Sequence, residues 1–426
     1  MIELSLVGGL LAVLFGATLW GAPGWPLWGA TLVVWAAVVT PVGNWGATVG
    51  LDTPAVYWGG PHGGATLGDL TFLVVVATAG AVGVTLQGRP HGVEQLLLGG
   101  IAVGAGWATL HTDHLVVLYL NLELQALALY TLVGYHRHHP PVMDAALRYL
   151  LAGSLVSGFT LYGFVGVYLH GGGFTLGDTP GVGSPWITAM VLFKLGAFPF
   201  WFWTPPVYDP LDWGTLALVV GPAKVNLWWL LTVGAAPVVA PTTVATAAVG
   251  SILVGAVGGY FQVTAAGVLA YSGVINAGYL LVLTWVGTPW GVVYYLGVYL
   301  VGTALVVAVA SPVVSTGVAH LSGWVALGAA TPLLLYYGVL NLGGLPVWPG
   351  FFGKVWLVTW GVTLGWGLVV LLVAASILPA VYYVGLAVAA LFEGGRPTRP
   401  GRWSPLTGAA LVVGAAAALA SGVAFF

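Results

Sequence analysis

Four ionisable residues lie deep inside long apolar stretches of this sequence, where a charge is costly. They are one acid, Glu123, and the only three lysines of the chain, Lys194, Lys224 and Lys354. A charge at the middle of a bilayer costs about 2.5–3.5 kcal/mol on insertion scales. One glutamate cannot neutralise three lysines, and a buried lysine near other positive charges releases its proton more readily than one in water. We therefore predict that these residues form a proton relay.

A structural role is the alternative for the same residues. Glu123 would pair with one lysine to fix helix packing, and the other lysines would extend to the membrane surface. Lys354 favours the relay, because it follows Gly343-Gly344-Leu345-Pro346 and Pro349-Gly350, which interrupt a helix. Broken helices at membrane depth line hydrated cavities in transporters.

The composition places these residues in a membrane. The chain has 426 residues, of which 59% are hydrophobic and 5% are charged, whereas roughly a quarter of residues are charged in a soluble domain. Runs of about 20 apolar residues span a bilayer, and they predict an all-α polytopic membrane protein. We place about fourteen transmembrane helices near 2–21, 25–42, 69–87, 95–110, 114–135, 144–170, 184–203, 213–233, 236–258, 265–286, 290–312, 325–362, 366–391 and 406–426.

The arginines support this count. Each one lies in or beside a loop that follows an odd-numbered helix, so all share one face, which the positive-inside rule assigns to the cytoplasm or matrix. Counting 325–362 as two spans would move the last three arginines to the opposite face. We therefore expect it to be one broken helix. The arginines are Arg89, Arg137, Arg148, Arg396, Arg399 and Arg402.

Other kinds of chemistry find no support in the sequence. The absence of cysteine argues against iron–sulfur ligation. The net charge of −2 argues against nucleic-acid binding. The nine histidines fall in loops or at the ends of spans. No nucleotide-binding fingerprint is present. We expect no metal or cofactor in this chain, and we expect lipid around it.

Distinctive motifs surround the charged residues and continue between them, from about residue 110 to residue 360. The motifs are Leu120-Asn121-Leu122-Glu123-Leu124-Gln125, Arg148-Tyr149-Leu150-Leu151, Phe193-Lys194-Leu195-Gly196-Ala197-Phe198-Pro199-Phe200, Leu269-Ala270-Tyr271-Ser272 and Gly350-Phe351-Phe352-Gly353-Lys354. They resemble, in the same order, those of the antiporter-like membrane subunits of respiratory complex I, and most closely NADH dehydrogenase subunit 2, called subunit N in bacteria.

The resemblance implies a role for each of the four charged residues. Glu123 and Lys194 match the family's glutamate–lysine pair, Lys224 a bridging lysine, and Lys354 the terminal lysine before an exit path. The chain would then be a non-redox, proton-translocating subunit of NADH:ubiquinone oxidoreductase, driven by quinone reduction in other subunits.

The resemblance also implies an architecture and a set of partners. It implies two inverted five-helix repeats with broken seventh and twelfth helices, at 95–235 and 236–392, flanked by 1–94 and 393–426. Other membrane-arm subunits would be partners, including neighbouring antiporter-like subunits and small membrane subunits, and NADH, FMN, iron–sulfur clusters and ubiquinone would lie in partner subunits. We expect the mitochondrial inner membrane, with a bacterial plasma membrane or a thylakoid as alternatives.

The sequence departs from the family pattern at four positions. Trp201 and Asn276 stand where histidines are expected, Pro206 where an aspartate is expected, and Ala266 where a lysine is expected. Without the histidines, bound water would carry the protons or the relay would be impaired. Two alternatives stay open: a subunit of a cation/proton antiporter or membrane-bound hydrogenase, and a structural membrane-arm spacer that has lost pumping.

Overall fold

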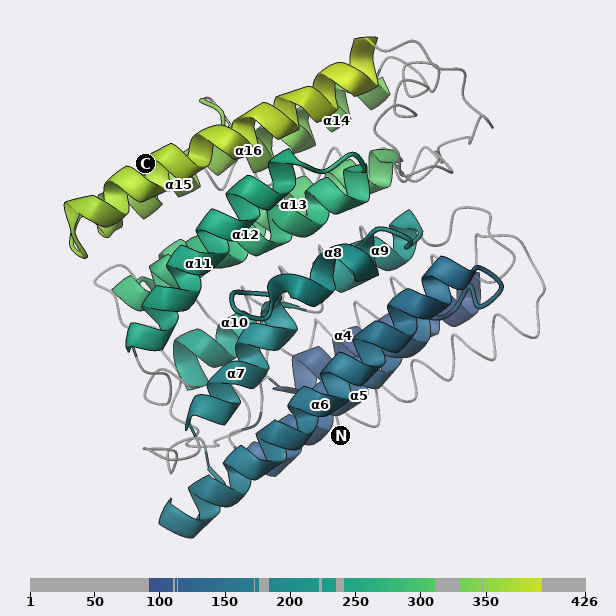
Figure 1. Ribbon diagram of the computed structural model, residues 1–426, viewed down its shortest axis with the longest axis vertical. Helices are drawn as coiled ribbons and strands as arrows, with labels where there is room; N and C mark the ends of the chain where they lie inside the picture. Colours follow the sequence, from purple (N-terminus) through teal and green to yellow (C-terminus); the bar gives the residue numbers. More distant parts are fainter. Residues whose placement is uncertain are drawn as a thin grey trace, which may run out of the picture.

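The computed structural model describes residues 92–109, 112, 114–171, 173–175, 184–221, 224–234, 241–310, 330–346 and 348–392. Within these ranges the protein is helical, with one isolated β-bridge between His114 and Thr175 and no β-strand. The helices run roughly parallel in Figure 1, from α4–α6 at one edge to α14–α16 at the other. Six helical segments of the described part are long and apolar enough to cross a membrane.

The first helices cover the lower edge in Figure 1. They are α4 (Gly92–Thr109), α5 (Leu115–Val133) and α6 (Pro140–Gly171). The prolines at the start of α6 need no backbone hydrogen bond there, which suits the first helical turn. Because α4 and α6 both pack against α5, the Glu123 side chain emerges between helices.

Two of the helices that end within the bundle have the same backbone motif at their ends. These helices are α7 (Ser184–Leu195) and α14 (Ala330–Gly343). Each is followed by a glycine with positive φ, Gly196 at 70° and Gly344 at 64°. The amides of Gly196 and Gly344 bond to the carbonyls three residues earlier, and the next amides bond five residues back. This is the Schellman ending, which glycine adopts without a steric penalty.

The chain continues differently after each break. After α7, residues 196–200 lead into a 3₁₀ turn, η2 (Trp201–Trp203), and the short helix α8 (Thr204–Tyr208). After α14, the chain turns into α15 (Pro349–Gly361). The break predicted within 325–362 is thus present, and 184–203 is interrupted as the family resemblance implied.

The span predicted at 213–233 is present as a candidate membrane crossing at Trp213–Thr232, but it is interrupted rather than continuous. The structure has α9 (Trp213–Val220), then α10 (Val225–Trp229) and a π-turn at Leu230–Gly234. Pro222 lacks the amide hydrogen needed to continue a helix and disfavours helical geometry in the residue before it. The break places Lys224 at the start of α10 rather than in the middle of a helix.

The remaining helices form the upper part of the bundle in Figure 1. They are α11 (Pro241–Tyr260), α12 (Ala265–Val286), α13 (Pro289–Ala310) and α16 (Trp366–Phe392). Helices α11 and α12 approach closely, because a β-carbon at Gly255 would lie 2.5 Å from the Ile275 backbone nitrogen. Such contacts through small residues are typical of membrane helix pairs.

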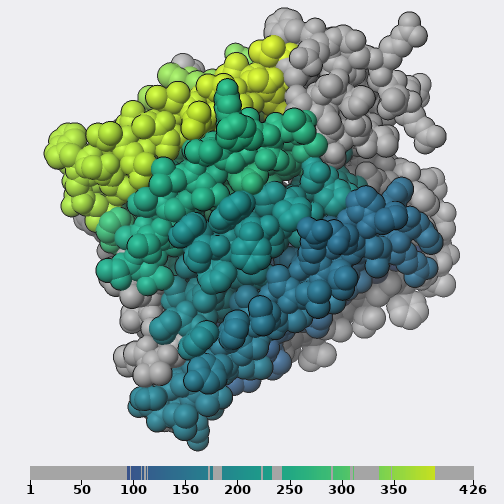
Figure 2. Space-filling model, in the orientation of Figure 1, coloured from purple at the N-terminus to yellow at the C-terminus, as the bar shows by residue number. Residues whose placement is uncertain are grey.

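Large apolar side chains are exposed on the two outer helices. Figure 2 shows one face of the molecule, with α6 along its lower edge and α16 along its upper edge. Leu155 on α6 and Ile377 on α16 are each 62% exposed. Outward-facing apolar side chains are what a lipid environment or a membrane partner requires.

The predicted helices from 95–110 to 366–391 each correspond to one or more of these elements. Those at 2–21, 25–42, 69–87 and 406–426 lie outside the described residues. The total of fourteen helices, the inverted repeats and the domain boundaries stay predictions.

Candidate functional site

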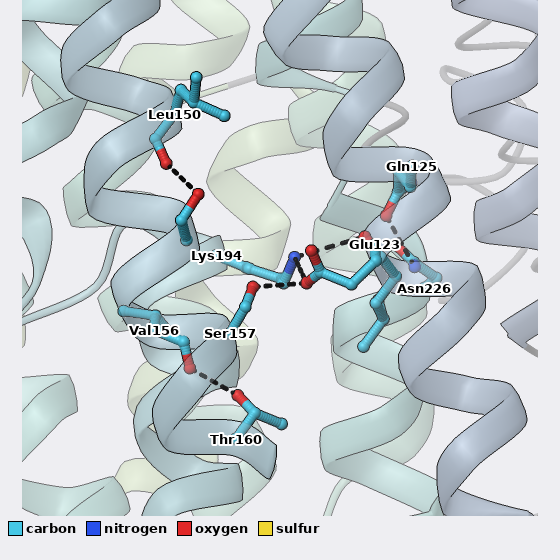
Figure 3. Close-up of polar contacts among 10 residues, drawn as sticks. Glu123, Gln125, Leu150, Val156, Ser157, Thr160, Lys194 and Asn226 are labelled. Atoms are coloured by element: carbon cyan, nitrogen blue, oxygen red, sulfur yellow. Dashed lines mark hydrogen bonds and ion pairs between the residues drawn. The ribbon is translucent and has the colours of Figure 1, made fainter.

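The acid and the first lysine are brought together from two helices. Lys194 Nζ on α7 lies 3.7 Å from Glu123 Oε1 on α5 and 3.4 Å from the carbonyl oxygen of Leu122. Ser157 on α6 donates a 2.5 Å hydrogen bond to the same Glu123 oxygen. Figure 3 shows these three side chains pointing toward one another. The lysine and glutamate side chains are 15% and 23% exposed, so each largely depends on the other for its solvation.

An amide pair lies next to this ion pair. Asn226 on α10 donates a 3.1 Å hydrogen bond to Gln125, which in turn donates to the carbonyl of Ala102 on α4. Both amides are buried. Sequence reasoning gave these residues no role, although each stands two positions after a charged residue in an apolar run. The pair ties the start of α10 to α5, and so sets where Lys224 enters the bundle.

Lys224 reaches back to the broken end of α7. Its Nζ donates a 2.9 Å hydrogen bond to the carbonyl of Leu195, the last residue of that helix. The Nζ also lies 5.7 Å from the centre of the Tyr208 ring. Lys224 thus bonds to the residue that directly follows Lys194.

Lys354 makes the equivalent contact at the broken end of α14. Its Nζ donates a 2.6 Å hydrogen bond to the carbonyl of Gly343, the last residue of α14. The Nζ lies 5.7 Å from the centre of the Tyr279 ring. Lys354 itself is on α15, the continuation of the same broken helix, and its side chain is buried.

The two lysine contacts share one physical cause. A Schellman ending satisfies the carbonyls two and three residues before the helix end and leaves the last one free. The C-terminal end of a helix also carries partial negative charge, which attracts cations. Leu195 and Gly343 each present such a free carbonyl, and each accepts a lysine.

The structure therefore joins three of the four residues singled out from sequence and separates the fourth. Glu123 and Lys194 form an ion pair, and Lys224 bonds to the last residue of α7, while Lys354 is at the end of α14. Lys194 is the next-to-last residue of α7 rather than central to a span.

Two positions that depart from the family pattern are also placed. The carbonyl oxygen of the Asn276 side chain accepts a 2.8 Å hydrogen bond from Tyr295, and Asn276 is buried on α12. Trp201 is in the turn after the α7 break, with its ring 5.8 Å from that of Tyr271. Neither residue contributes a titratable group.

These features define a class: a polytopic α-helical membrane protein whose charged side chains are held at breaks in its helices. Residues 112–379 match the family described as NADH:quinone oxidoreductase/Mrp antiporter, TM. The chain belongs to this family, and within it to the subunit N branch, also called subunit 2.

Relatives from several groups of organisms support that placement. Subunit 14 of NADH-quinone oxidoreductase from Thermus thermophilus is 32% identical over 83% of this chain and 82% of its own length. Subunit N 1 from Acidiphilium cryptum is 31% identical over 71% and 69%. Chain 2 of NADH-ubiquinone oxidoreductase from Metridium senile is 31% identical over 65% and 77%.

Solved structures show the same fold. A chain of respiratory complex I from Thermus thermophilus, with bound aureothin, superposes with a TM-score of 0.84 at 27% identity, covering 99% of this chain and 97% of that one. A chain of the archaeal membrane-bound sulfane sulfur reductase gives a TM-score of 0.79 at 17% identity, covering 99% and 94%. The second likeness concerns the fold alone.

Proposed function

We propose that this chain is a membrane-arm subunit of an NADH:quinone oxidoreductase and moves protons along Glu123, Lys194, Lys224 and Lys354. The observation that carries the proposal is the ion pair between Glu123 and Lys194 near the end of α7, with Lys224 bonded to the next residue, Leu195. An acid and a lysine that form an ion pair respond to each other's protonation. The family membership supplies the complex in which such a response is useful.

The mechanism starts at the Glu123–Lys194 pair. While Glu123 is ionised it stabilises the Lys194 ammonium at 3.7 Å. When the glutamate gains a proton or is drawn away by a neighbouring subunit, Lys194 loses its counter-charge and gives up its proton. The nearest cationic site is Lys224, on the adjoining Leu195 carbonyl. Lys354 receives the proton last, at the end of α14.

The chain does no redox chemistry in this proposal. NADH, FMN, iron–sulfur clusters and ubiquinone would be bound by partner subunits, and the energy would arrive as a change at Glu123, which is partly exposed beside α6. The exposed apolar surfaces of α6 and α16 would contact neighbouring antiporter-like subunits, small membrane subunits and lipid.

The location follows from the same reasoning. An energy-converting membrane is required, and both the mitochondrial inner membrane and a bacterial plasma membrane meet that requirement. The relatives come from Thermus, Acidiphilium, Metridium and Synechococcus, so the mitochondrial inner membrane expected from sequence and the bacterial and thylakoid alternatives all stay open.

The test uses the intact complex in sealed vesicles. Replacing Lys194 and Lys224 together by alanine should leave electron transfer possible and lower the number of protons moved per electron. A normal proton-to-electron ratio in this double variant would refute the proposal and favour a structural spacer. Copurification with antiporter subunits alone, without flavin and iron–sulfur subunits, would favour the cation/proton antiporter instead.

A further inference from the structure

A buried polar cluster lies between Lys224 and Lys354. Tyr295 on α13 donates a 2.8 Å hydrogen bond to Asn276 on α12. Asn276 donates a 2.7 Å bond to the backbone carbonyl of Ser272, and Tyr383 on α16 donates to the Ser272 hydroxyl. All four side chains are buried. A hydrogen-bonded cluster in an apolar interior has a defined arrangement, because every unpaired group there is costly.

The buried tyrosine hydroxyls without a hydrogen-bond partner among the described residues are those of Tyr208, Tyr299 and Tyr382. Tyr299 follows Tyr295 by one helical turn of α13, so both side chains lie on the same face. The Tyr299 side chain is buried, and its hydroxyl has no hydrogen-bond partner among the described residues. Thr303, one turn further, uses its own hydroxyl to donate to the Tyr299 backbone carbonyl at 2.9 Å. Packing alone gives no reason to keep an unpaired phenol here, since phenylalanine would avoid the desolvation cost.

The unpaired Tyr299 hydroxyl lies near Lys224. A β-carbon at Gly273 on α12 would lie 3.5 Å from the Tyr299 hydroxyl oxygen and 3.8 Å from Lys224 Nζ. The Tyr299 oxygen and Lys224 Nζ thus both lie close to the position that a β-carbon would take at residue 273. Because this residue is glycine, no side chain occupies the space between them. A small movement of the flexible lysine, or one bridging water, would connect the two groups.

The other end of the cluster lies near Lys354. The rings of Tyr279 and Tyr295 meet edge to face with centroids 6.0 Å apart, and Lys354 Nζ lies 5.7 Å from the centre of the Tyr279 ring. A β-carbon on Gly353, the residue before Lys354, would lie 2.8 Å from the Tyr295 ring. Tyr295 is thus one helical turn from Tyr299 and packs beside Tyr279 and the residue that precedes Lys354.

We propose that Tyr299 and Tyr295 pass protons between Lys224 and Lys354, and that Gly273 keeps the Lys224 end of this route open. The inference rests on the proposed function and names the residues that connect its two halves. Each transfer leaves the tyrosine unchanged. The Tyr299 oxygen accepts a proton from the Lys224 ammonium and passes its own proton to Tyr295, which passes its own to a neutral Lys354. At each oxygen one O–H bond forms and one breaks, Lys224 becomes neutral, and Lys354 becomes an ammonium. Asn276 orients the Tyr295 hydroxyl and does not itself titrate.

The first test is Tyr299→Phe in the intact complex, reconstituted in sealed vesicles. We expect the number of protons moved per electron to fall to the level of a Lys224→Ala variant, while thermal stability is unchanged or raised. A purely structural tyrosine would show the same stability but would leave the ratio at its normal value, so the ratio decides between the two roles.

The second test is Gly273→Ala. The added methyl group would be in ordinary van der Waals contact with its neighbours, and alanine favours a helix more than glycine does, so the fold should be retained. We expect this methyl to reduce the proton-to-electron ratio by separating Lys224 from Tyr299. Gly385→Ala on α16 is the matched control, because its β-carbon would meet nothing within 4 Å.

The outcomes separate this inference from the proposed function. A normal ratio in Lys224→Ala overturns the proposed function, and the inference with it. A lowered ratio in Lys224→Ala with a normal ratio in Tyr299→Phe overturns the tyrosine route alone, whatever Gly273→Ala does. Lowered ratios in all three variants, with Gly385→Ala normal, support the route.

Discussion

The two broken helices of this protein end in the same way but lie in different electrostatic surroundings. Both α7 and α14 finish in a Schellman turn with a positive-φ glycine, and both offer their last carbonyl to a lysine. Around α7 there are an acid and a second lysine. Between residues 241 and 392, Lys354 is the only Asp, Glu, Lys or Arg in the sequence.

We infer different roles for the first half of the bundle, which contains α7, and for the second half, which contains α14. Lys194 can be stabilised or released by a change at Glu123, so the first half can respond to a signal from outside the chain. No acid among the described residues forms an ion pair with Lys354, so its charge is not set by a neighbouring carboxylate in that part of the chain. We infer that the first half controls when a proton moves and the second half receives it.

The largest effect is expected from a substitution that disrupts the contact between the end of α14 and the start of α15. The Gly350 amide donates a 2.9 Å hydrogen bond to the Asn341 side chain, and a β-carbon at Gly350 would overlap the Asn341 backbone carbonyl. Gly350→Ala should therefore destabilise the protein by about 3 kcal/mol, measured as a lower thermal midpoint in detergent. Gly367→Ala, where a β-carbon would meet nothing, should have little effect. Equal midpoints for the two variants would show that α14 and α15 are not held together at this point.

A second prediction compares the two positive-φ glycines. Gly196→Ala and Gly344→Ala should each cost about 1–2 kcal/mol, because alanine is strained in the left-handed region. Only Gly344→Ala also displaces a lysine, since its β-carbon would lie 2.6 Å from Lys354 Cδ, whereas that of Gly196 would meet Thr204 at 2.6 Å. At matched stability, proton transport should fall more in Gly344→Ala. A larger fall in Gly196→Ala would contradict the assignment of Lys354 as receiver.

A third prediction sharpens the contrast in charge. In a double-mutant cycle, Glu123→Gln and Lys194→Gln should show a coupling of about 1 kcal/mol in thermal stability, because either change alone leaves an unpaired charge. The matched cycle of Glu123→Gln with Lys354→Gln should be additive, since the two residues share no contact. Coupling of similar size in both cycles would mean that the halves are not electrostatically separate.

The smallest effect is expected at Ser157. Its hydroxyl stabilises the ionised form of Glu123 through a 2.5 Å hydrogen bond. Among the described residues, Lys354 has no ion-paired acid that a hydroxyl could support in this way. Ser157→Ala should destabilise by about 0.5 kcal/mol and modestly lower the rate of proton transport. Ser154→Ala is the control, because Ser154 bonds only to the backbone carbonyl of Leu150 on its own helix. Identical transport in both variants would remove Ser157 from the site.

The charged residues and one of the breaks were predictable, because a charge in an apolar run and a Gly-Gly-Leu-Pro sequence are local signals. Residues 184–203 carry a similar signal, Gly196 followed by Pro199, which was recognised only through the family resemblance. The break at Gly221 was missed because the apolar run continues across Pro222. Spacing could not predict that Lys224 bonds to Leu195, since that contact depends on how three helices pack.

Contacts at the helix ends also differ in how they can form as the chain enters the membrane. The Lys354 bond to Gly343 joins residues 11 apart in sequence, and the Lys224 bond to Leu195 joins residues 29 apart. The Lys194 bond to Leu122 joins residues 72 apart. During synthesis from the N-terminus, Glu123 is therefore inserted long before its lysine, whereas Lys354 finds its partner already in place. The helix carrying Glu123 should need protection at the insertion site until α7 arrives, which makes this helix the vulnerable step in producing the protein.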